Sequence, residues 1–369
     1  DFNDGKLMFS GGNKMLIYTV SKGVVNATPT EIKFTKSGAA YQVGSHKGAV
    51  DITLNDDGSY WVIGKDQSPI HFNSNGEYIE QVATSAVNGY AVAGRFIDFG
   101  TQKYMAAATY LNKSATTLAE GALSFANITD GISNITPLFS PTDGLGTTRN
   151  TQFMQSVCYE PTTTGLNIWV LSALQGIAHY ACPAPTVVPD PEPEEPTEPI
   201  VDDIITELFE VWNYSEIGAN LSEASWFSTS APQSRDMAFC NGKLYIVNSN
   251  AAYNSSQSVK IVNAYTGANI GTLSLNGVTE GQLYAASIKA MGGKVIMSNG
   301  APSGTPLKVY CWDNDASEPY VILNDATHGS VQVGEIMSVW GDLNYGKLMF
   351  SDGNKMLIYT VSKGVVNAT

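Results

Sequence analysis

The first and last 28 residues of this 369-residue chain have almost the same sequence. Residues 1–28 read DFNDGKLMFSGGNKMLIYTVSKGVVNAT and residues 342–369 read DLNYGKLMFSDGNKMLIYTVSKGVVNAT, so only three positions differ. The two segments lie 341 residues apart, far beyond the roughly 20 to 50 residues of a solenoid or blade repeat. The repetition therefore indicates duplication of a whole domain. It predicts that the chain starts inside one copy and stops at the same phrase of the next.

A proline-rich acidic segment divides the chain between these ends. Residues 183–203 read PAPTVVPDPEPEEPTEPIVDD and hold seven prolines and seven acidic residues. Proline fixes φ and removes a hydrogen-bond donor, and like charges repel, so the segment favours an extended spacer. We therefore predict three parts: residues 1–182 as the C-terminal part of one copy or a permuted half of a ring, the linker 183–203, and residues 204–369 as the N-terminal part of the next copy.

Outside the linker, short apolar runs are separated by turn signals every eight to twelve residues, a pattern typical of β-strands. The runs fall into groups of four, which predicts an all-β propeller with six blades of four antiparallel strands, five or seven blades being alternatives. The group within residues 152–182 has only three strands. The run LFEVWNY at residues 208–214 would complete it and close the ring.

In a six-bladed ring, the two repeat copies would claim the same blade position. One copy must then enter a second ring, either in a longer chain or by strand exchange with a neighbour, which predicts head-to-tail assembly. The residues expected to carry assembly and ring closure are Leu7, Phe9, Leu208, Phe209, Val211, Trp212, Leu348 and Phe350.

The charge balance restricts the partners of the chain. Twenty Lys and Arg residues against 34 Asp and Glu residues give a net charge of −14, which repels phosphate backbones and anionic membrane surfaces. No apolar run approaches the roughly 20 residues that a membrane helix needs. We expect no nucleic-acid partner and no membrane insertion. The expected partners are neighbouring copies of the chain, glycans or cell-surface proteins.

The stretch from Trp212 to Ser351 resembles propeller domains of unknown function found in surface lipoproteins and adhesin-like proteins of bacteria. The phrases that carry the resemblance include RDMAFCNGKLYIVN, VKIVNAYTGANIGTL, LKVYCWDNDASEPYVIL and GEIMSVWGD. The resemblance implies a β-propeller present in tandem copies at the cell surface, and thus an extracellular location. It brings no assigned active site with it.

Signatures of catalysis and metal binding are missing from the sequence. Four histidines, His46, His71, His179 and His328, have no partner at metal-ligand spacing. The acidic turns 55–58 and 313–315 offer oxygen ligands that suit calcium, but neither continues as a twelve-residue loop with a terminal Glu. The nucleophile motif GxSxG is absent. We predict no catalytic residue, no metal ligand and no cofactor, with calcium as the alternative.

Aromatic residues are the best candidates for ligand contact, because Tyr and Trp suit surfaces that are half apolar and half wet. The glycan-contact candidates are Trp212, Tyr214, Trp226 and Trp312, and core packing is the competing interpretation. The main prediction is a non-catalytic extracellular structural or adhesive module, and we expect the chain not to be an enzyme. The alternative is a glycan-binding surface module or a glycan-processing enzyme on a propeller scaffold.

Overall fold

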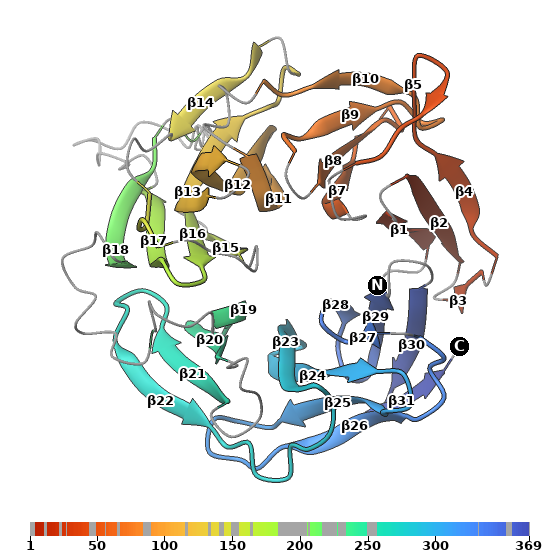
Figure 1. Cartoon of the computed structure of the whole chain (residues 1–369), viewed down its shortest axis with the longest axis vertical. Coiled ribbons are helices and arrows are strands. Elements are labelled where there is room, and N and C mark those ends of the chain that lie inside the picture. The colour runs from red at the N-terminus through yellow and green to blue at the C-terminus, as the bar shows by residue number, and fades with distance from the viewer. Residues whose placement is uncertain are drawn as a thin grey trace, which may run out of the picture.

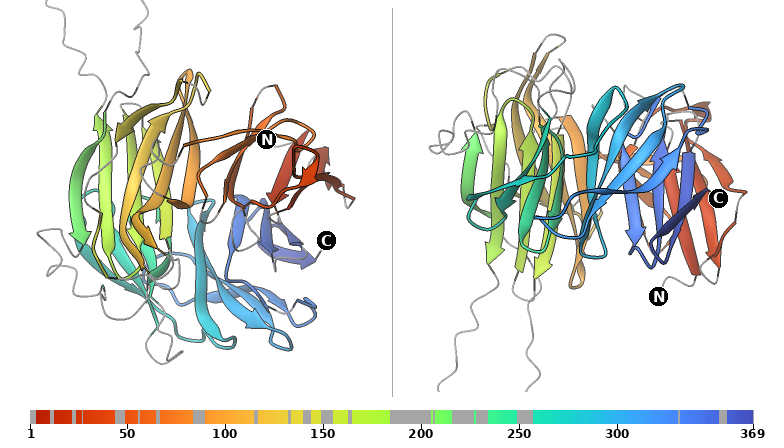
Figure 2. Two further views of the ribbon diagram at one scale, coloured as in Figure 1. Left: turned by 45° about the horizontal axis from the view of Figure 1, so that its top comes forward. Right: turned by 90° about the horizontal axis from the view of Figure 1, so that it is seen from below.

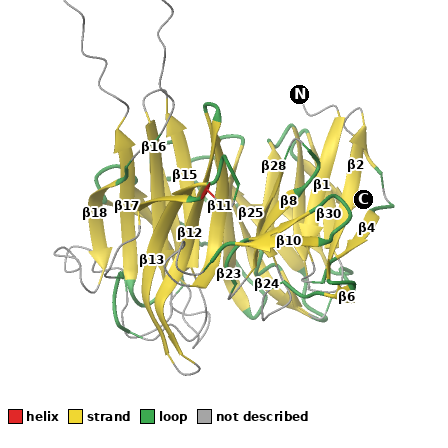
Figure 3. Ribbon diagram, turned by 90° about the horizontal axis from the view of Figure 1, so that it is seen from above, coloured by secondary structure: helices red, strands yellow, loops and turns green. Residues whose placement is uncertain are grey.

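The computed structural model of this chain describes residues 4–10, 13–21, 24–26, 28–43, 49–55, 57–64, 67–83, 90–114, 117–131, 134–139, 144–148, 155–162, 165–183, 205, 207–215, 227, 234–248, 257–330, 332–351 and 356–368. Its named elements are all β-strands, β1 to β31, and strands fill the body of the molecule (Figure 3). Within these ranges, no helix has the length and apolar character to cross a membrane. The prediction of an all-β fold is confirmed.

The described strands form antiparallel sheets that lie side by side around a common centre (Figure 1). In chain order, the first four sheets consist of β1 (Asp4–Ser10), β2 (Lys14–Ser21), β3 (Val24–Val25) and β4 (Thr30–Lys33); β7 (Ala49–Leu54), β8 (Tyr60–Gly64), β9 (Ile70–Phe72) and β10 (Tyr78–Gln81); β11 (Tyr90–Phe99), β12 (Gln102–Ser114), β13 (Thr117–Asn127) and β14 (Thr136–Phe139); and β15 (Gln155–Thr162), β16 (Gly165–Ser172), β17 (Gly176–Pro183) and β18 (Phe209–Ser215).

The later sheets repeat this plan. They consist of β19 (Ser234–Cys240), β20 (Lys243–Asn248), β21 (Ser258–Asn263) and β22 (Asn269–Leu273); β23 (Leu283–Met291), β24 (Lys294–Pro302), β25 (Leu307–Trp312), β26 (Tyr320–Asp325) and β27 (Gln332–Val333); and β28 (Met337–Gly341), β29 (Tyr345–Ser351), β30 (Met356–Ser362) and β31 (Val365–Ala368). A small two-stranded sheet pairs β5 (Thr35–Lys36) with β6 (Ala39–Ala40).

Most strands pair with the strand that follows them in sequence, so most of the sheets are up-and-down meanders, and Figure 2 shows them from the side of the molecule. The first strands of successive sheets, such as β11, β15, β19 and β23, lie nearest the centre (Figure 1). Hairpin turns use glycine where the sequence predicted positive φ, with Gly58 at 82° and Gly76 at 86°. A Cβ on Gly76 would lie 2.5 Å from the Lys33 carbonyl oxygen, so this turn also requires the missing side chain.

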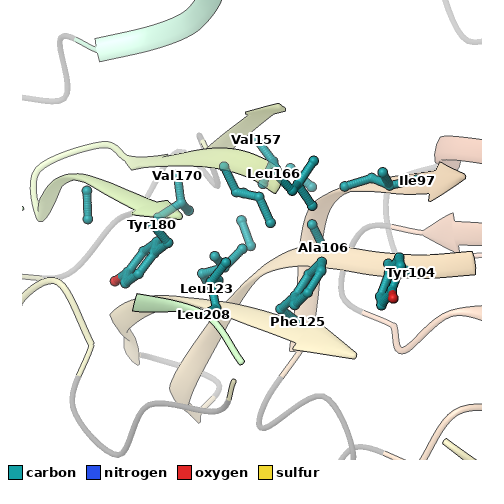
Figure 4. Packing of buried hydrophobic residues seen from close by; sticks show 14 of the residues in the cluster. Ile97, Tyr104, Ala106, Leu123, Phe125, Val157, Leu166, Val170, Tyr180 and Leu208 are labelled. Carbon is teal, nitrogen blue, oxygen red and sulfur yellow. The ribbon is translucent and has the colours of Figure 1, made fainter. Parts of the chain in front are cut away.

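The core lies between neighbouring sheets, where their apolar faces meet. Figure 4 shows one such cluster between the sheet of β11–β14 and the sheet of β15–β18. Tyr104 and Phe125 stack there with ring centroids 5.3 Å apart, and Val170 packs against the same cluster. Removing apolar surface from water at each such junction stabilises the arrangement of the sheets.

The chain returns after the proline-rich segment to the sheet that precedes it. Strand β18 pairs antiparallel with β17, with Trp212 opposite His179. Just before β18, the backbone N–H of Ile205 donates to the Tyr104 hydroxyl at 2.7 Å, and Leu208 is buried in the cluster of Figure 4. The run 208–214 thus supplies the fourth strand of this sheet. Residues 184–204, most of the predicted linker, lie outside the described residues.

The two copies of the repeat form strands of two different sheets, β1–β3 and β29–β31. The described residues therefore make seven sheets of four or five strands, and the predicted count of six blades is not confirmed. The assumption that both copies compete for one position was wrong for this structure, because each copy folds onto neighbours of its own. The argument for strand exchange that depended on this competition is lost with it.

Candidate functional site

A buried carboxylate joins the inner strands of three neighbouring sheets. Asp236 lies on β19, and its Oδ2 accepts hydrogen bonds from Ser287 Oγ at 2.7 Å, from Ile288 N at 3.0 Å and from Lys289 Nζ, all on β23. Its Oδ1 accepts a longer bond of 3.4 Å from Ser156 Oγ on β15. The side chain of Asp236 is only 15% exposed. This network therefore ties β15, β19 and β23 together near the centre of the molecule.

The electrostatics of Asp236 favour a structural role. Burial works to raise the pKa of its carboxyl, but the charge and hydrogen bond of Lys289 and the bond from Ser287 outweigh burial and hold that pKa below its usual range. The carboxylate is therefore ionised, and both of its oxygens are engaged. Ser287 Oγ also accepts a bond of 3.3 Å from the backbone N–H of Met337 on β28, which extends the network to a fourth sheet.

A cavity of about 310 Å³ lies between the sheet of β19–β22 and the sheet of β23–β27. Its walls come from the β19–β20 turn, the β23–β24 turn and the loop that follows β25. Asn241 links the two turns, because its Nδ2 donates to the Gly293 carbonyl oxygen at 3.0 Å. The loop after β25 is shaped by Asn314, whose Oδ1 accepts from Ala316 N at 3.0 Å in an Asx turn.

Two carboxylates of this loop are held by lysines from the two turns. Asp315 forms a short ion pair with Lys243 and accepts a hydrogen bond of 2.6 Å from the Tyr245 hydroxyl. Asp313 pairs with Lys294 at 2.5 Å and stays the more accessible of the two, with 57% of its side chain exposed. The cavity thus presents carboxylate acceptors and ammonium donors side by side, in equal number.

The charges in the cavity reinforce one another. The hydrogen bond from Lys294 holds the pKa of Asp313 below its usual range, and the same bond raises the pKa of Lys294. Burial, followed by the hydrogen bond to Asp315, raises the pKa of Tyr245 and keeps its phenol protonated. Near neutral pH, Asp313 therefore accepts hydrogen bonds, and Lys294 and Tyr245 remain donors.

Of the three predicted glycan contacts that lie in the described part of the chain, only Trp312 lines this cavity. Its ring is 1% exposed, and its Nε1 donates to the Ser274 carbonyl oxygen at 2.9 Å, so only part of the ring forms a wall. Tyr320, which was not among the predicted residues, is 39% exposed, and its hydroxyl donates to Asp313 Oδ1 at 3.3 Å. Trp226 lies outside the described residues.

Trp212 and Tyr214 lie elsewhere, at the junction between β18 and the sheet of β19–β22. Their rings are 8% and 6% exposed, and a Cβ on Gly267 would collide with both. Trp212 Nε1 donates to the Ala264 carbonyl oxygen at 3.0 Å. The structure gives these two rings a packing role between sheets. Their contact with a glycan stays a prediction.

The residues predicted to carry assembly and ring closure are spread over three sheets. Leu208 and Trp212 are buried, whereas Phe209 and Val211 of β18 are 47% and 48% exposed on the outer strand of their sheet. Their role in assembly stays a prediction.

The other four assembly candidates come from the two repeat copies. Leu348 and Phe350 are buried within the last sheet. Leu7 and Phe9 lie on β1, opposite Tyr18 and Leu16, and their side chains are outside the described part of the molecule.

The described histidines occupy separate environments. His179 lies between the rings of Trp169 and Trp212, and burial lowers its pKa to about 4. His328 Nε2 lies 2.9 Å from the Thr305 carbonyl oxygen, and His46 lies outside the described residues. No group of three or more His, Cys, Asp or Glu side chains in the described ranges is arranged to hold a metal ion. Calcium binding stays a prediction.

No protein-family model matches this chain, and no curated protein sequence matches it. Solved structures do share its fold. "YCF48 bound to D1 peptide" has a TM-score of 0.52 at 13% identity, with 98% of this chain and 89% of that chain covered. A Bacteroides uniformis protein with a proposed 6-phosphogluconolactonase assignment has a TM-score of 0.53 at 11% identity, with 100% and 95% covered. The chain is a β-propeller.

Puromycin hydrolase is a third neighbour, with a TM-score of 0.50 at 10% identity, covering 100% of this chain and 52% of that one. At such identities the likeness shows the fold alone. It still corrects the expectation that this chain is not an enzyme, because solved propellers with enzyme names share its architecture. The resemblance to a propeller family is confirmed for the fold, whereas surface location and tandem copies stay predictions.

The lysine–carboxylate pairs of the cavity were missed because their residues come from three separate turns. A weak signal was present: the turns CNGK (240–243) and MGGK (291–294) both place a lysine directly after a turn glycine, in successive strand groups. The acidic turn 313–315 by itself indicated only oxygen ligands that suit calcium. Its pairing with Lys243 and Lys294 depends on how two sheets pack, which the sequence does not show.

Proposed function

We propose that this propeller binds a neutral glycan in the cavity between the sheet of β19–β22 and the sheet of β23–β27. The observation that carries the proposal is the balance of charge in the cavity. Asp313 and Asp315 are matched by Lys294 and Lys243, so the polar groups offer donors and acceptors without a net charge. Sugar hydroxyls both donate and accept hydrogen bonds, and they suit such a surface better than an ion does.

The dimensions and the apolar wall support this ligand class. A volume of about 310 Å³ lies at the lower end of small-molecule sites, which span about 300–1,000 Å³. Leu273, Val295 and Trp312 line the cavity beside the polar groups, and their exposed fractions of 4%, 5% and 1% leave a small apolar surface for the C–H groups of a sugar. A partly exposed aromatic ring, Tyr320, lies beside Asp313 at the rim.

The lowered pKa of Asp313 favours the binding of a sugar in this cavity over the cleavage of a glycosidic bond. Glycoside hydrolysis needs one carboxyl group that stays protonated to act as the general acid. Lys294 holds Asp313 in the ionised form, and Asp315 is committed to Lys243 and Tyr245. The two carboxylates are therefore suited to accept hydrogen bonds from hydroxyl groups of a bound sugar.

The test is titration calorimetry of the whole chain against a panel of neutral mono- and oligosaccharides. Asp313→Asn removes the exposed acceptor charge, and we expect affinity for the binding sugar to fall at least about 10-fold, equivalent to about 1.4 kcal/mol. Asp98→Asn is the matched control, because Asp98 also pairs with a lysine, Lys103 at 3.0 Å, on a different sheet. Equal affinity of both variants and the parent, or no binding of any sugar in the panel, would contradict the proposal.

A further inference from the structure

The first sheet lacks a strand that the last sheet has. Strand β29 of the second repeat copy pairs with β30 on one side and with β28 on the other (Figure 1). Its counterpart in the first copy, β1, pairs with β2 and with no other strand of the described ranges. Within these ranges one edge of β1 is therefore open. An open strand edge presents backbone N–H and C=O groups with which a further strand can pair.

The open edge of β1 has the same residues as the edge that β28 covers. Strand β28 lies opposite residues 346–350 of β29, which read GKLMF. The equivalent residues 5–9 of β1 also read GKLMF, and the three differences between the copies all fall outside this stretch. A strand that fits the edge of β29 therefore meets the same sequence at the edge of β1.

The backbone of β1 presents the same groups at that edge as β29 does. Leu7 pairs with Tyr18 as Leu348 pairs with Tyr359, and this match holds along the whole of both strands. In an antiparallel ladder, hydrogen-bonded and non-hydrogen-bonded pairs alternate, so the register with one neighbour fixes which groups point to the other side. The groups that β29 offers to β28 are thus the groups that β1 offers at its open edge.

Apolar side chains add to the pairing between β28 and the second copy. Met337 of β28 is 1% exposed and belongs to one cluster with Leu348 and Phe350, and Val339 packs against that cluster. The first copy has leucine and phenylalanine at the two equivalent positions. Cross-strand pairs of apolar residues stabilise a sheet, and the residue types that make these pairs with β28 are present in both copies.

We propose that the open edge of β1 is an interaction surface that binds strand β28 of a second copy of this chain. In the complex, β1 of one copy replaces β29 of the other as the partner of β28, so the strand pairing is conserved. This is domain swapping, the exchange of identical elements between protomers. Each chain carries both β28 and the β1 edge, so the exchange links copies into a closed pair or a head-to-tail series, and its extent rises with protein concentration.

The first test is disulfide trapping in a mixture of two variants of the whole chain. One variant carries Val339→Cys and the other carries Leu7→Cys, so a disulfide between these positions can form only between chains. The double variant Val339→Cys/Leu348→Cys is the matched control, because Val339 lies opposite Leu348 within the chain. We expect the mixture to give a covalent dimer. Peptide mass spectrometry separates the link between positions 7 and 339 from disulfides of the four native cysteines.

The second test changes the two repeat copies in opposite directions and measures association of the whole chain by analytical ultracentrifugation. Leu348→Ala weakens the packing of β29 beside β28, so it should lower the dimer dissociation constant at least about 10-fold relative to the parent. Leu7→Ala, added to Leu348→Ala, weakens the edge that accepts β28 and should reverse this gain at least about 10-fold. Non-specific association of a destabilised chain would increase with the second substitution instead.

Three results would overturn the proposal. One is a mixture without the link between positions 7 and 339 under conditions in which the control variant forms its own disulfide. Another is a double variant, Val339→Cys/Leu7→Cys, whose disulfide closes within a monomer, because β28 would then pair with β1 of the same chain. The third is association of Leu348→Ala that Leu7→Ala does not reduce. Failure here leaves the glycan cavity untouched, because the two sites share no residue.

Discussion

The two copies of the terminal repeat have nearly the same sequence and form the same hairpin, but they lie in different environments. Leu7 pairs with Tyr18 in the first copy, and Leu348 pairs with Tyr359 in the second, so the strand register is the same. The neighbours differ: β1 is the first strand of its sheet, whereas β29 has β28 beside it. The comparison teaches that the repeat encodes a hairpin, and that the surrounding strands decide how much of it is buried.

The tyrosines at equivalent positions show this difference most clearly. Tyr359 is 2% exposed, its ring meets Phe350 edge-on at 5.9 Å, and its hydroxyl donates to Asp325 Oδ2 at 2.6 Å. Tyr18 is only partly buried. Asp325 is the last residue of β26, the outer strand of the preceding sheet, so the second copy is tied to a neighbour through this bond.

The largest effect is expected from truncating the two tyrosines. Tyr359→Ala should lower the free energy of unfolding by about 3–5 kcal/mol, because it opens a cavity and removes a buried hydrogen bond. Tyr18→Ala should cost less than about half as much, because part of the ring is already in water. Urea denaturation of both variants measures the difference. Equal costs would show that the two copies are energetically alike and that the burial difference has no consequence.

A smaller effect, with a pH dependence, is expected from removing only the hydroxyls. Burial and then the hydrogen bond to Asp325 raise the pKa of Tyr359, and burial raises that of Tyr18 by less. A raised tyrosine pKa gives stability that is present below pH 10 and is lost as the pH rises above 10. Tyr359→Phe should therefore cost about 0.5–1.5 kcal/mol at pH 7.

The control for this prediction is the same change in the other copy. Above about pH 10, the parent loses the stability that the Tyr359 hydroxyl contributes. The difference in free energy of unfolding between the parent and Tyr359→Phe should therefore narrow. Tyr18→Phe should show a smaller cost and a smaller narrowing. Urea titrations at pH 7 and at about pH 11 provide the measurement. A constant gap between the parent and Tyr359→Phe across this range would contradict the assignment.

The smallest effect is expected at one of the three positions where the copies differ. Tyr345 in the second copy replaces Asp4 of the first, is 44% exposed, and meets the Trp340 ring edge-on at 5.7 Å. Tyr345→Asp makes the copies alike here and should cost about 0.5–1.5 kcal/mol, the worth of an aromatic pair. A thermal shift assay can detect it. A cost above about 3 kcal/mol would mean that this contact, and not the neighbouring strands, distinguishes the copies.

Local sequence was enough to predict strands, turns and the fourth strand supplied by residues 208–214. Alternation of apolar residues and the glycine turns at 58 and 76 act over a few residues, so a single sequence displays them. The number of sheets was not predictable in the same way, because it depended on whether both repeat copies find neighbours. The candidate sites were less predictable than the strands, since Lys243 and Asp315 meet only when two sheets pack.

The amino-acid sequence alone set the all-β class, the repeated hairpin and its register, because these follow from side-chain alternation and turn chemistry within a few residues. Packing of the sheets set the rest: which copy of the hairpin is buried, and which charges share a cavity. It is also within a folded sheet that His71 comes to lie between Ser59 and Glu80. Such contacts join residues from separate turns and strands, and their energies exist only once the chain has brought them together.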